Sequence, residues 1–282
     1  MYNNFRFKSR DSIRGKYGSR PARPYFRSNS GPSRFSGSRG GARRSQLEGA
    51  DINMFIKKAA PVIQDQETLT STSFDTYNLS QELKTNIKDH GYTTATPIQA
   101  QVIEPILQGR DVIGLASTGT GKTAAFLIPI IQKIYTDRNQ KALIIVPTRE
   151  LALQINEEFR SLTRNMKLYS AFIIGGTNMY RQIQDLRRNP HIVVATPGRL
   201  KDLIERKAIF LADYANIVLD EVDLMVDIGF VADVKYFISQ MPKVRQSLFF
   251  SATISPKIQE ILQAFVNNPV TKIGRASCRE RV

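Results

Sequence analysis

The sequence predicts an α/β fold, a mostly parallel β-sheet with helices on both faces. Short runs that are apolar throughout recur along the chain, and segments of helical apolar spacing separate them. Strands without polar alternation are buried on both faces, and helical crossovers join parallel neighbours. The ligands of such sheets bind at the carboxyl ends of the strands. The expected strands are 111–116, 141–147, 167–174, 191–196, 215–220 and 246–252.

Two helices are expected before the first strand, 111–116. Leu79, Leu83 and Ile87 recur at helical spacing, with Ser80 as N-cap and Gly91 as the stop. Thr96 and Pro97 begin the next helix and place Gln99 on its first turn, where Gln99 alone is most simply a surface glutamine. Later helices are expected at 124–135, through 151–159, through 183–186, from 197, and through 258–265.

The net charge of +15 is unevenly distributed. Residues 1–50 hold twelve Lys/Arg and two Asp/Glu, a balance of +10, whereas 51–272 hold 25 and 22, a balance of +3. The first 50 residues, rich in Arg, Gly and Ser, are predicted to be a disordered basic tail that binds single-stranded nucleic acid loosely. A solubilising tail without a specific partner is the alternative. Residues 51–73 read as a linker with a short helix near 54–58, and the folded domain as 74–272.

Cys278 is the one cysteine of the chain, which excludes an internal disulfide framework and favours a reducing compartment. No apolar run reaches the length of a membrane span. We expect a cytoplasmic protein. An organellar location is the alternative, because the start is rich in arginine and serine and poor in acids.

A glycine-rich loop joins the strand at 111–116 to the following helix. Its glycines allow the backbone to approach a polyphosphate closely, and its N–H groups face the negative charge. Lys122 would contact the outer phosphates, and the Thr123 hydroxyl would ligate Mg²⁺. An ordinary turn that happens to contain lysine is the alternative, and Ala116 stands where the generic pattern has glycine. The candidate nucleotide-binding residues here are Ser117, Thr118, Gly119, Thr120, Gly121, Lys122 and Thr123.

Two acids follow the strand at 215–220. Beside a phosphate loop, Asp220 would hold Mg²⁺, partly through water, and Glu221 would orient and deprotonate the attacking water. Alternatively, the acids only favour the positive N-terminus of the next helix.

In series, these motifs resemble the first RecA-like domain of DEAD-box RNA helicases. The matching stretches lie between 74 and 272 and follow the order of that family: TPIQ (96–99), ASTGTGKT (116–123), PTRELALQ (147–154), GG (175–176), TPGR (196–199), DEVD (220–223) and SAT (251–253). The resemblance implies a RecA-like P-loop domain that binds ATP and Mg²⁺ and contacts RNA. ATP hydrolysis would be coupled to local RNA unwinding in an intact two-domain protein.

The resemblance also assigns further residues. Gln99 would read the adenine edge, with Tyr92 or Phe74 stacking on the base or supporting it. Asp223 would link to Ser251 and Thr253 and so couple the nucleotide to the RNA site. The RNA backbone would be contacted by Pro147, Thr148, Arg149, Gly176, Thr196, Pro197, Gly198 and Arg199. Locally, the Pro147-Thr148 and Thr196-Pro197 pairs could be helix starts alone.

Two departures qualify the resemblance. Val222 replaces the usual alanine of the acidic motif, and we expect it to be tolerated. The second RecA-like domain, which supplies arginine fingers and half of the RNA surface, is expected to be missing after Lys272. The segment 273–282 reads as the translation of a sequencing-adapter oligonucleotide and is expected to be non-native, just where VTKI (270–273) begins another strand. The truncated chain alone should be nearly inactive.

Two other classes of function stay open on sequence alone. One is a non-enzymatic RNA-binding module in which the basic tail dominates affinity. The other is a P-loop ATPase that acts on DNA.

Overall fold

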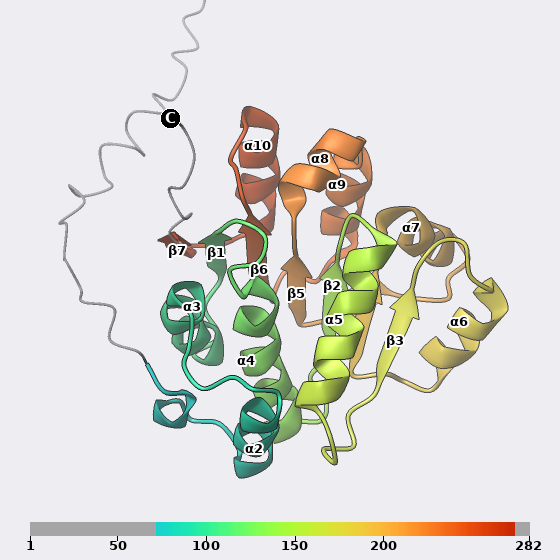
Figure 1. Ribbon diagram of the computed structural model, residues 1–282. Helices are drawn as coiled ribbons and strands as arrows, with labels where there is room; N and C mark the ends of the chain where they lie inside the picture. The colour runs from blue at the N-terminus through green and yellow to red at the C-terminus, as the bar shows by residue number, and fades with distance from the viewer. Residues whose placement is uncertain (1–71, 274–282) are drawn as a thin grey trace, which may run out of the picture. The chain divides into compact units, whose positions relative to one another are not determined.

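The computed structural model of the chain describes residues 72–273, which form a seven-stranded sheet covered by helices (Figure 1). Every pairing in the sheet is parallel, and the strand order is β3-β4-β2-β5-β6-β1-β7. The strands are β1 (Val112–Leu115), β2 (Ala142–Ile145), β3 (Ser170–Ile173), β4 (Ile192–Ala195), β5 (Asn216–Leu219), β6 (Gln246–Ser251) and β7 (Val270–Ile273). The predicted α/β fold class is therefore confirmed.

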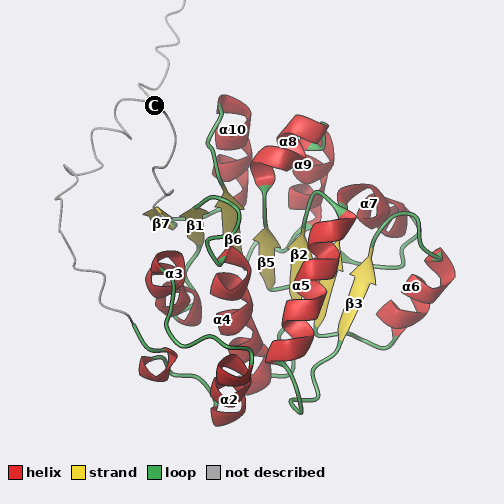
Figure 2. Cartoon of the chain, viewed as in Figure 1, coloured by secondary structure: helices red, strands yellow, loops and turns green. Residues whose placement is uncertain are grey.

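Helices cover both faces of this sheet (Figure 2). One face carries α2 (Gln81–Asp89), α3 (Pro97–Leu107), α4 (Lys122–Thr136) and α5 (Arg149–Leu162). The other carries α6 (Met179–Arg187), α7 (Pro197–Glu205), α8 (Val222–Ile228), α9 (Val231–Gln240) and α10 (Pro256–Phe265). Two 3-10 turns, η1 (Phe74–Thr76) and η2 (Leu211–Asp213), complete the described elements.

The inner strands β2, β4 and β5 contribute side chains to two hydrophobic cores, one on each face of the sheet. In and just after β2, Ala142, Ile144 and Val146 face the core beneath α3 and α4, whereas Leu143 and Ile145 face the core beneath α7 and α9. Successive side chains of a strand point to opposite faces, so a strand such as β2, which is covered on both sides, is apolar throughout.

The predicted helix signals act as expected. The Ser80 side chain accepts a hydrogen bond from the Leu83 N–H at the start of α2, and Gly91 follows that helix with φ of +91°. Thr96 and Pro97 begin α3. The tail at 1–50, the short helix near 54–58 and the segment 274–282 lie outside the described residues.

β7 confirms the strand that was expected to begin at VTKI (270–273). Val270 to Ile273 pair in register with β1, so this segment completes the edge of the same sheet. Ile273, which was expected to begin a foreign segment, pairs with Leu115. Within residues 72–273, no helix is both long and apolar enough to cross a membrane.

Candidate functional site

The loop between β1 and α4 has the backbone geometry of an anion cradle. Gly119 and Gly121 have φ of +83° and +87°, which disfavours any residue with a Cβ. A Cβ on Gly121 would also lie 2.6 Å from the Gln99 Nε2. The Thr120 hydroxyl donates to the Ser117 carbonyl oxygen over 2.8 Å, which closes the loop on itself. The two glycines thus allow a loop conformation in which the backbone can approach an anion closely.

Lys122 is the first residue of α4 and is 5% exposed. Within the described part of the chain, its Nζ is buried and has no hydrogen-bond partner. A buried ammonium that lacks a partner is costly, so the position favours a ligand with negative charge. Thr123 follows it in the first turn of the helix and is half-buried.

Asp220 is buried at the end of β5, and one carboxylate oxygen accepts the Glu221 N–H over 2.9 Å. Burial raises the pKa of Asp220 to about 6, with the nearby Lys122 charge acting in the opposite direction and Glu221 adding to the rise. Asp220 and Lys122 are therefore a carboxylate and an ammonium in one desolvated site, and the Lys122 Nζ has no hydrogen-bond partner there.

Glu221 lies at the sharp turn from β5 into α8, with φ of +53° and ψ of +50°. Its Oε1 accepts a hydrogen bond from the Thr118 hydroxyl over 3.1 Å, across 103 positions of the chain. A left-handed conformation at a residue other than glycine is strained, and such strain concentrates at functional positions. The turn holds the Glu221 carboxylate against the phosphate loop.

Gln99 is 2% exposed, so the interpretation as a surface glutamine is wrong. Its Oε1 accepts the Thr96 N–H over 2.9 Å, and its Nε2 donates to the Gly121 carbonyl over 3.1 Å. The amide therefore ties the start of α3 to the last glycine of the phosphate loop. The isolated motif could not reveal this burial, because the covering loop comes from another part of the chain.

Tyr92 packs on Phe74 with 6.3 Å between ring centroids and 27° between ring planes. The Tyr92 hydroxyl donates to the Glu158 carboxylate on α5 over 2.6 Å. Phe74 is buried, so of the two aromatics only Tyr92 offers a ring to a ligand. Glu158 was missed by sequence reasoning, and nothing in its local sequence marks it as the partner of a distant tyrosine.

Asp223 contacts the loop after β6, but differently from the predicted link. Its Oδ2 accepts the backbone N–H of Ala252 over 3.2 Å, and the Ser251 hydroxyl donates to the Thr253 carbonyl over 2.8 Å. The predicted links from Asp223 to Ser251 and Thr253 are thus replaced by one bond to the residue between them. The Ala252 N–H therefore points at Asp223 of α8, whereas the Ser251 hydroxyl forms its hydrogen bond within the turn that follows β6.

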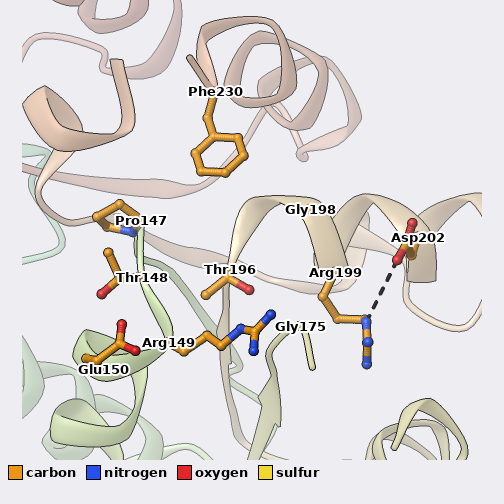
Figure 3. A pocket seen from close by; sticks show the side chains of 10 residues that line it. All are labelled: Pro147, Thr148, Arg149, Glu150, Gly175, Thr196, Gly198, Arg199, Asp202 and Phe230. Carbon is orange, nitrogen blue, oxygen red and sulfur yellow. Dashed lines mark ion pairs between the residues drawn. The ribbon is translucent and has the colours of Figure 1, made fainter. Parts of the chain in front are cut away.

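A groove of about 570 Å³ lies at the carboxyl ends of β2, β3 and β4 (Figure 3). It brings together six of the eight residues predicted to contact RNA, from two distant segments of the chain; Gly176 and Pro197 are not in its lining. Glu150, Asp202 and Phe230 also line the groove and were not predicted. Phe230 follows Gly229, which ends α8 with φ of +102°, and that glycine was the available signal for a turn there. The groove is lined by Pro147, Thr148, Arg149, Glu150, Gly175, Thr196, Gly198, Arg199, Asp202 and Phe230.

Arg149 lies across the two glycines that follow β3. A Cβ on Gly176 would overlap its guanidinium group, and one on Gly175 would approach its Nη2 to 3.0 Å. The Gly-Gly pair is thus required for an exposed arginine to lie flat in the groove. Figure 3 shows this side chain reaching from the start of α5 toward Gly175.

Arg199 faces the groove from the first turn of α7. Its Nη1 donates to the Thr177 carbonyl over 3.2 Å, and its Nε lies 3.8 Å from the Asp202 carboxylate. Thr148 caps α5 by accepting the Leu151 N–H, and Pro197 is buried at the start of α7. The Pro147-Thr148 and Thr196-Pro197 pairs are thus helix starts, and the N-termini of α5 and α7 that they begin face the groove.

The sequence from residue 96 to 261 matches the model of one family, described as DEAD/DEAH box helicase. The chain belongs to the DEAD/DEAH box helicase family. Its curated DEAD-box relatives include the RNA helicase CshA of Bacillus licheniformis, 45% identical over 198 residues, and that of Limosilactobacillus reuteri, 46% identical over 199 residues. Each alignment covers 70% of this chain, but the chain spans only about 40% of these relatives' length (41% and 40%).

Solved structures agree with this DEAD-box assignment. A DEAD box protein of Methanococcus jannaschii superposes with a TM-score of 0.69 at 36% identity, covering 72% of this chain and 56% of that one. A hypothetical ATP-dependent RNA helicase of Sulfolobus tokodaii gives 0.64 at 36% identity, covering 69% and 57%. The predicted resemblance is confirmed, and the fold is RecA-like. In this DEAD-box domain, Val222 is fully buried in the core beneath α8.

Proposed function

We propose that this domain is the ATP-binding half of an ATP-dependent RNA helicase. The observation that carries the proposal is the buried, unpartnered Lys122 Nζ beside the buried Asp220 carboxylate, directly after a glycine-rich loop. An anion at Lys122 and a cation at Asp220 would satisfy both groups together. A nucleotide phosphate chelated to a divalent metal has that distribution of charge.

The polyphosphate would lie on the N–H groups of the loop from Ser117 to Gly121, with Lys122 donating to its outer oxygens. Thr123 and Asp220 fit Mg²⁺, the latter partly through water. When bound, the metal neutralises charge that develops on the phosphate oxygens. Glu221 would accept a proton from the attacking water, because its carboxylate already lies against the phosphate loop through Thr118.

The adenine would be read at the Gln99 end of the loop. The Gln99 side-chain amide connects the Gly121 carbonyl to the N-terminus of α3. A base that forms hydrogen bonds with this amide would therefore be held at a fixed position relative to phosphates in the loop. Tyr92 would pack on the base, and the buried Phe74 would support Tyr92 from behind.

RNA would bind the groove through its phosphates. Arg149 supplies an exposed guanidinium, and the N-termini of α5 and α7 supply N–H groups, none of which distinguishes one base from another. The coupling between the sites would pass from Asp223 to Ala252. We therefore propose recognition of RNA by backbone and shape.

Full turnover would require a second RecA-like domain, as the family resemblance implies. Arginines contributed in trans to phosphoryl transfer are worth about 10³ to 10⁵ in rate. The 282-residue chain alone should therefore bind nucleotide weakly and hydrolyse ATP very slowly, with or without RNA.

RNA-stimulated ATPase activity tests this function. We expect turnover when the chain is joined to the second RecA-like domain of a two-domain DEAD-box helicase, and its loss in Glu221→Gln. Asp213→Asn, an exposed acid in η2, is the matched control. DNA of the same sequence should stimulate less, because preference for RNA requires contact with the 2′-hydroxyl. Full RNA-stimulated activity from the chain alone, abolished by Lys122→Ala, would contradict the need for a second domain.

A further inference from the structure

The edge of the domain formed by β3 and α6 carries exposed aromatic and basic side chains that the proposed nucleotide and RNA sites do not use. We name it the β3–α6 face and define it by Tyr169, Tyr180, Arg181, Arg187 and Arg188, all of which are exposed. β3 is an end strand of the sheet, so one side of it has no neighbouring strand within the described residues. Figure 1 shows α6 beside β3 at this edge.

The face is basic, although the domain as a whole is nearly neutral. Residues 179–188, which include α6, contain three arginines and one acid, Asp185, a balance of +2, against +3 for all of 51–272. Asp185 offsets only Arg188, at 3.3 Å. His191 lies next to the face, and burial together with the charges of Arg138 and Lys141 lowers its pKa. The local charge therefore favours a polyanion.

Two tyrosines on this face are exposed to solvent and do not belong to the hydrophobic cores. Tyr169 is 63% exposed and its ring stacks on the His191 imidazole, with 6.0 Å between centroids and 24° between planes. Tyr180, in the first turn of α6, is 69% exposed. Exposed aromatic rings together with arginines are the combination by which proteins bind single strands without sequence preference.

The face is continuous with the groove that holds Arg149 and Arg199. Arg199 of the groove donates to the Thr177 carbonyl, and Asn178 caps α6 immediately afterwards, with Tyr180 in the first turn of that helix. At the other end of α6, Arg188 and Asp185 line a hollow of about 330 Å³ together with Tyr169. α6 is nine residues long, which corresponds to about 14 Å, or about four nucleotides of a stacked strand.

We propose that the β3–α6 face binds the single-stranded flank of an RNA whose central nucleotides occupy the groove, with bases stacked on Tyr180 and Tyr169 and phosphates on Arg181, Arg187 and Arg188. This inference rests on the proposed RNA function of the groove and extends its site size. If this inference holds, an RNA long enough to extend beyond the groove binds the protein more tightly than one that only fills the groove.

Fluorescence anisotropy with the full chain and single-stranded RNAs of about six and about twelve nucleotides tests the proposal. Tyr169→Ala/Tyr180→Ala should weaken binding of the longer RNA by about 5- to 150-fold per stacked base, and leave the shorter RNA unaffected. Tyr169→Phe/Tyr180→Phe keeps the ring faces and should bind like the wild type. Phe210→Ala, which removes an aromatic that is 58% exposed outside the face, is the matched control.

A charge variant gives a second, independent measurement. Arg187→Ser/Arg188→Ser should reduce the salt dependence of binding for the longer RNA but not for the shorter one. Retention of long-RNA affinity within about twofold in the double alanine variant would overturn the proposal, as would equal losses for both RNAs. Failure of the wild type to bind the shorter RNA would instead refute RNA binding in the groove, on which the extension rests.

Discussion

Asp220→Asn should stabilise the nucleotide-free protein while it disables the metal site. Burial raises the Asp220 pKa from 3.8 to about 6, so the folded state binds the proton more tightly than the unfolded chain does. The free energy of unfolding must then fall as pH rises between these two values. The shift of two pH units corresponds to about 3 kcal/mol at neutral pH. Asparagine keeps an oxygen for the Glu221 N–H and avoids this penalty.

Urea unfolding in EDTA without nucleotide measures the effect. The free energy of unfolding of the variant should exceed that of the wild type by about 3 kcal/mol near pH 7.5. Near pH 4.5, where the wild-type carboxyl is protonated in the folded state, the difference should be only about 1 kcal/mol. Asp213→Asn, which changes an exposed acid in η2, should stay within about 0.5 kcal/mol of the wild type at both pH values. A difference for Asp220→Asn that is independent of pH, or a less stable variant near pH 7.5, would refute the reasoning.

Three further predictions follow from single contacts. Gly176→Ala should lower RNA affinity by about 10- to 100-fold and leave ATP affinity unchanged, because its Cβ displaces the Arg149 guanidinium; equal losses of both would contradict this. Ser80→Ala should lower the free energy of unfolding by about 1 kcal/mol in urea, since α2 loses its cap, and an unchanged midpoint would contradict the capping role. Gln99→Ala should bring GTP and ATP to similar affinities in competition titrations, and retained preference for ATP would exclude Gln99 as the adenine reader.

The sequence was sufficient to predict the parallel sheet and to predict that the functional residues follow the carboxyl ends of its strands. Strands such as β2 are buried on both faces and are therefore apolar throughout, a pattern visible without knowledge of their neighbours. Parallel pairing then places the segments after β1, β2, β4 and β5 at one edge, whatever the strand order. This is why the phosphate loop, Asp220 and the groove residues could be predicted together.

What the sequence could not reveal are contacts between distant segments. The burial of Gln99 depends on the Gly121 carbonyl, and the Glu221 contact depends on the Thr118 hydroxyl. Neither partner is identified by spacing. The bond from Asp223 to the Ala252 N–H was missed because it depends on the local turn after β6, which side-chain types do not specify.

Binding of ATP with Mg²⁺ to the 282-residue chain tests the central claim most directly. In one equilibrium titration, the wild type should bind, and Lys122→Ala should bind about 10- to 100-fold more weakly, because the phosphates lose a charged hydrogen-bond donor. Lys88→Ala, which removes an exposed lysine of α2, should bind like the wild type. Equal affinity of Lys122→Ala and the wild type, or no binding of ATP by the wild type, would contradict the account.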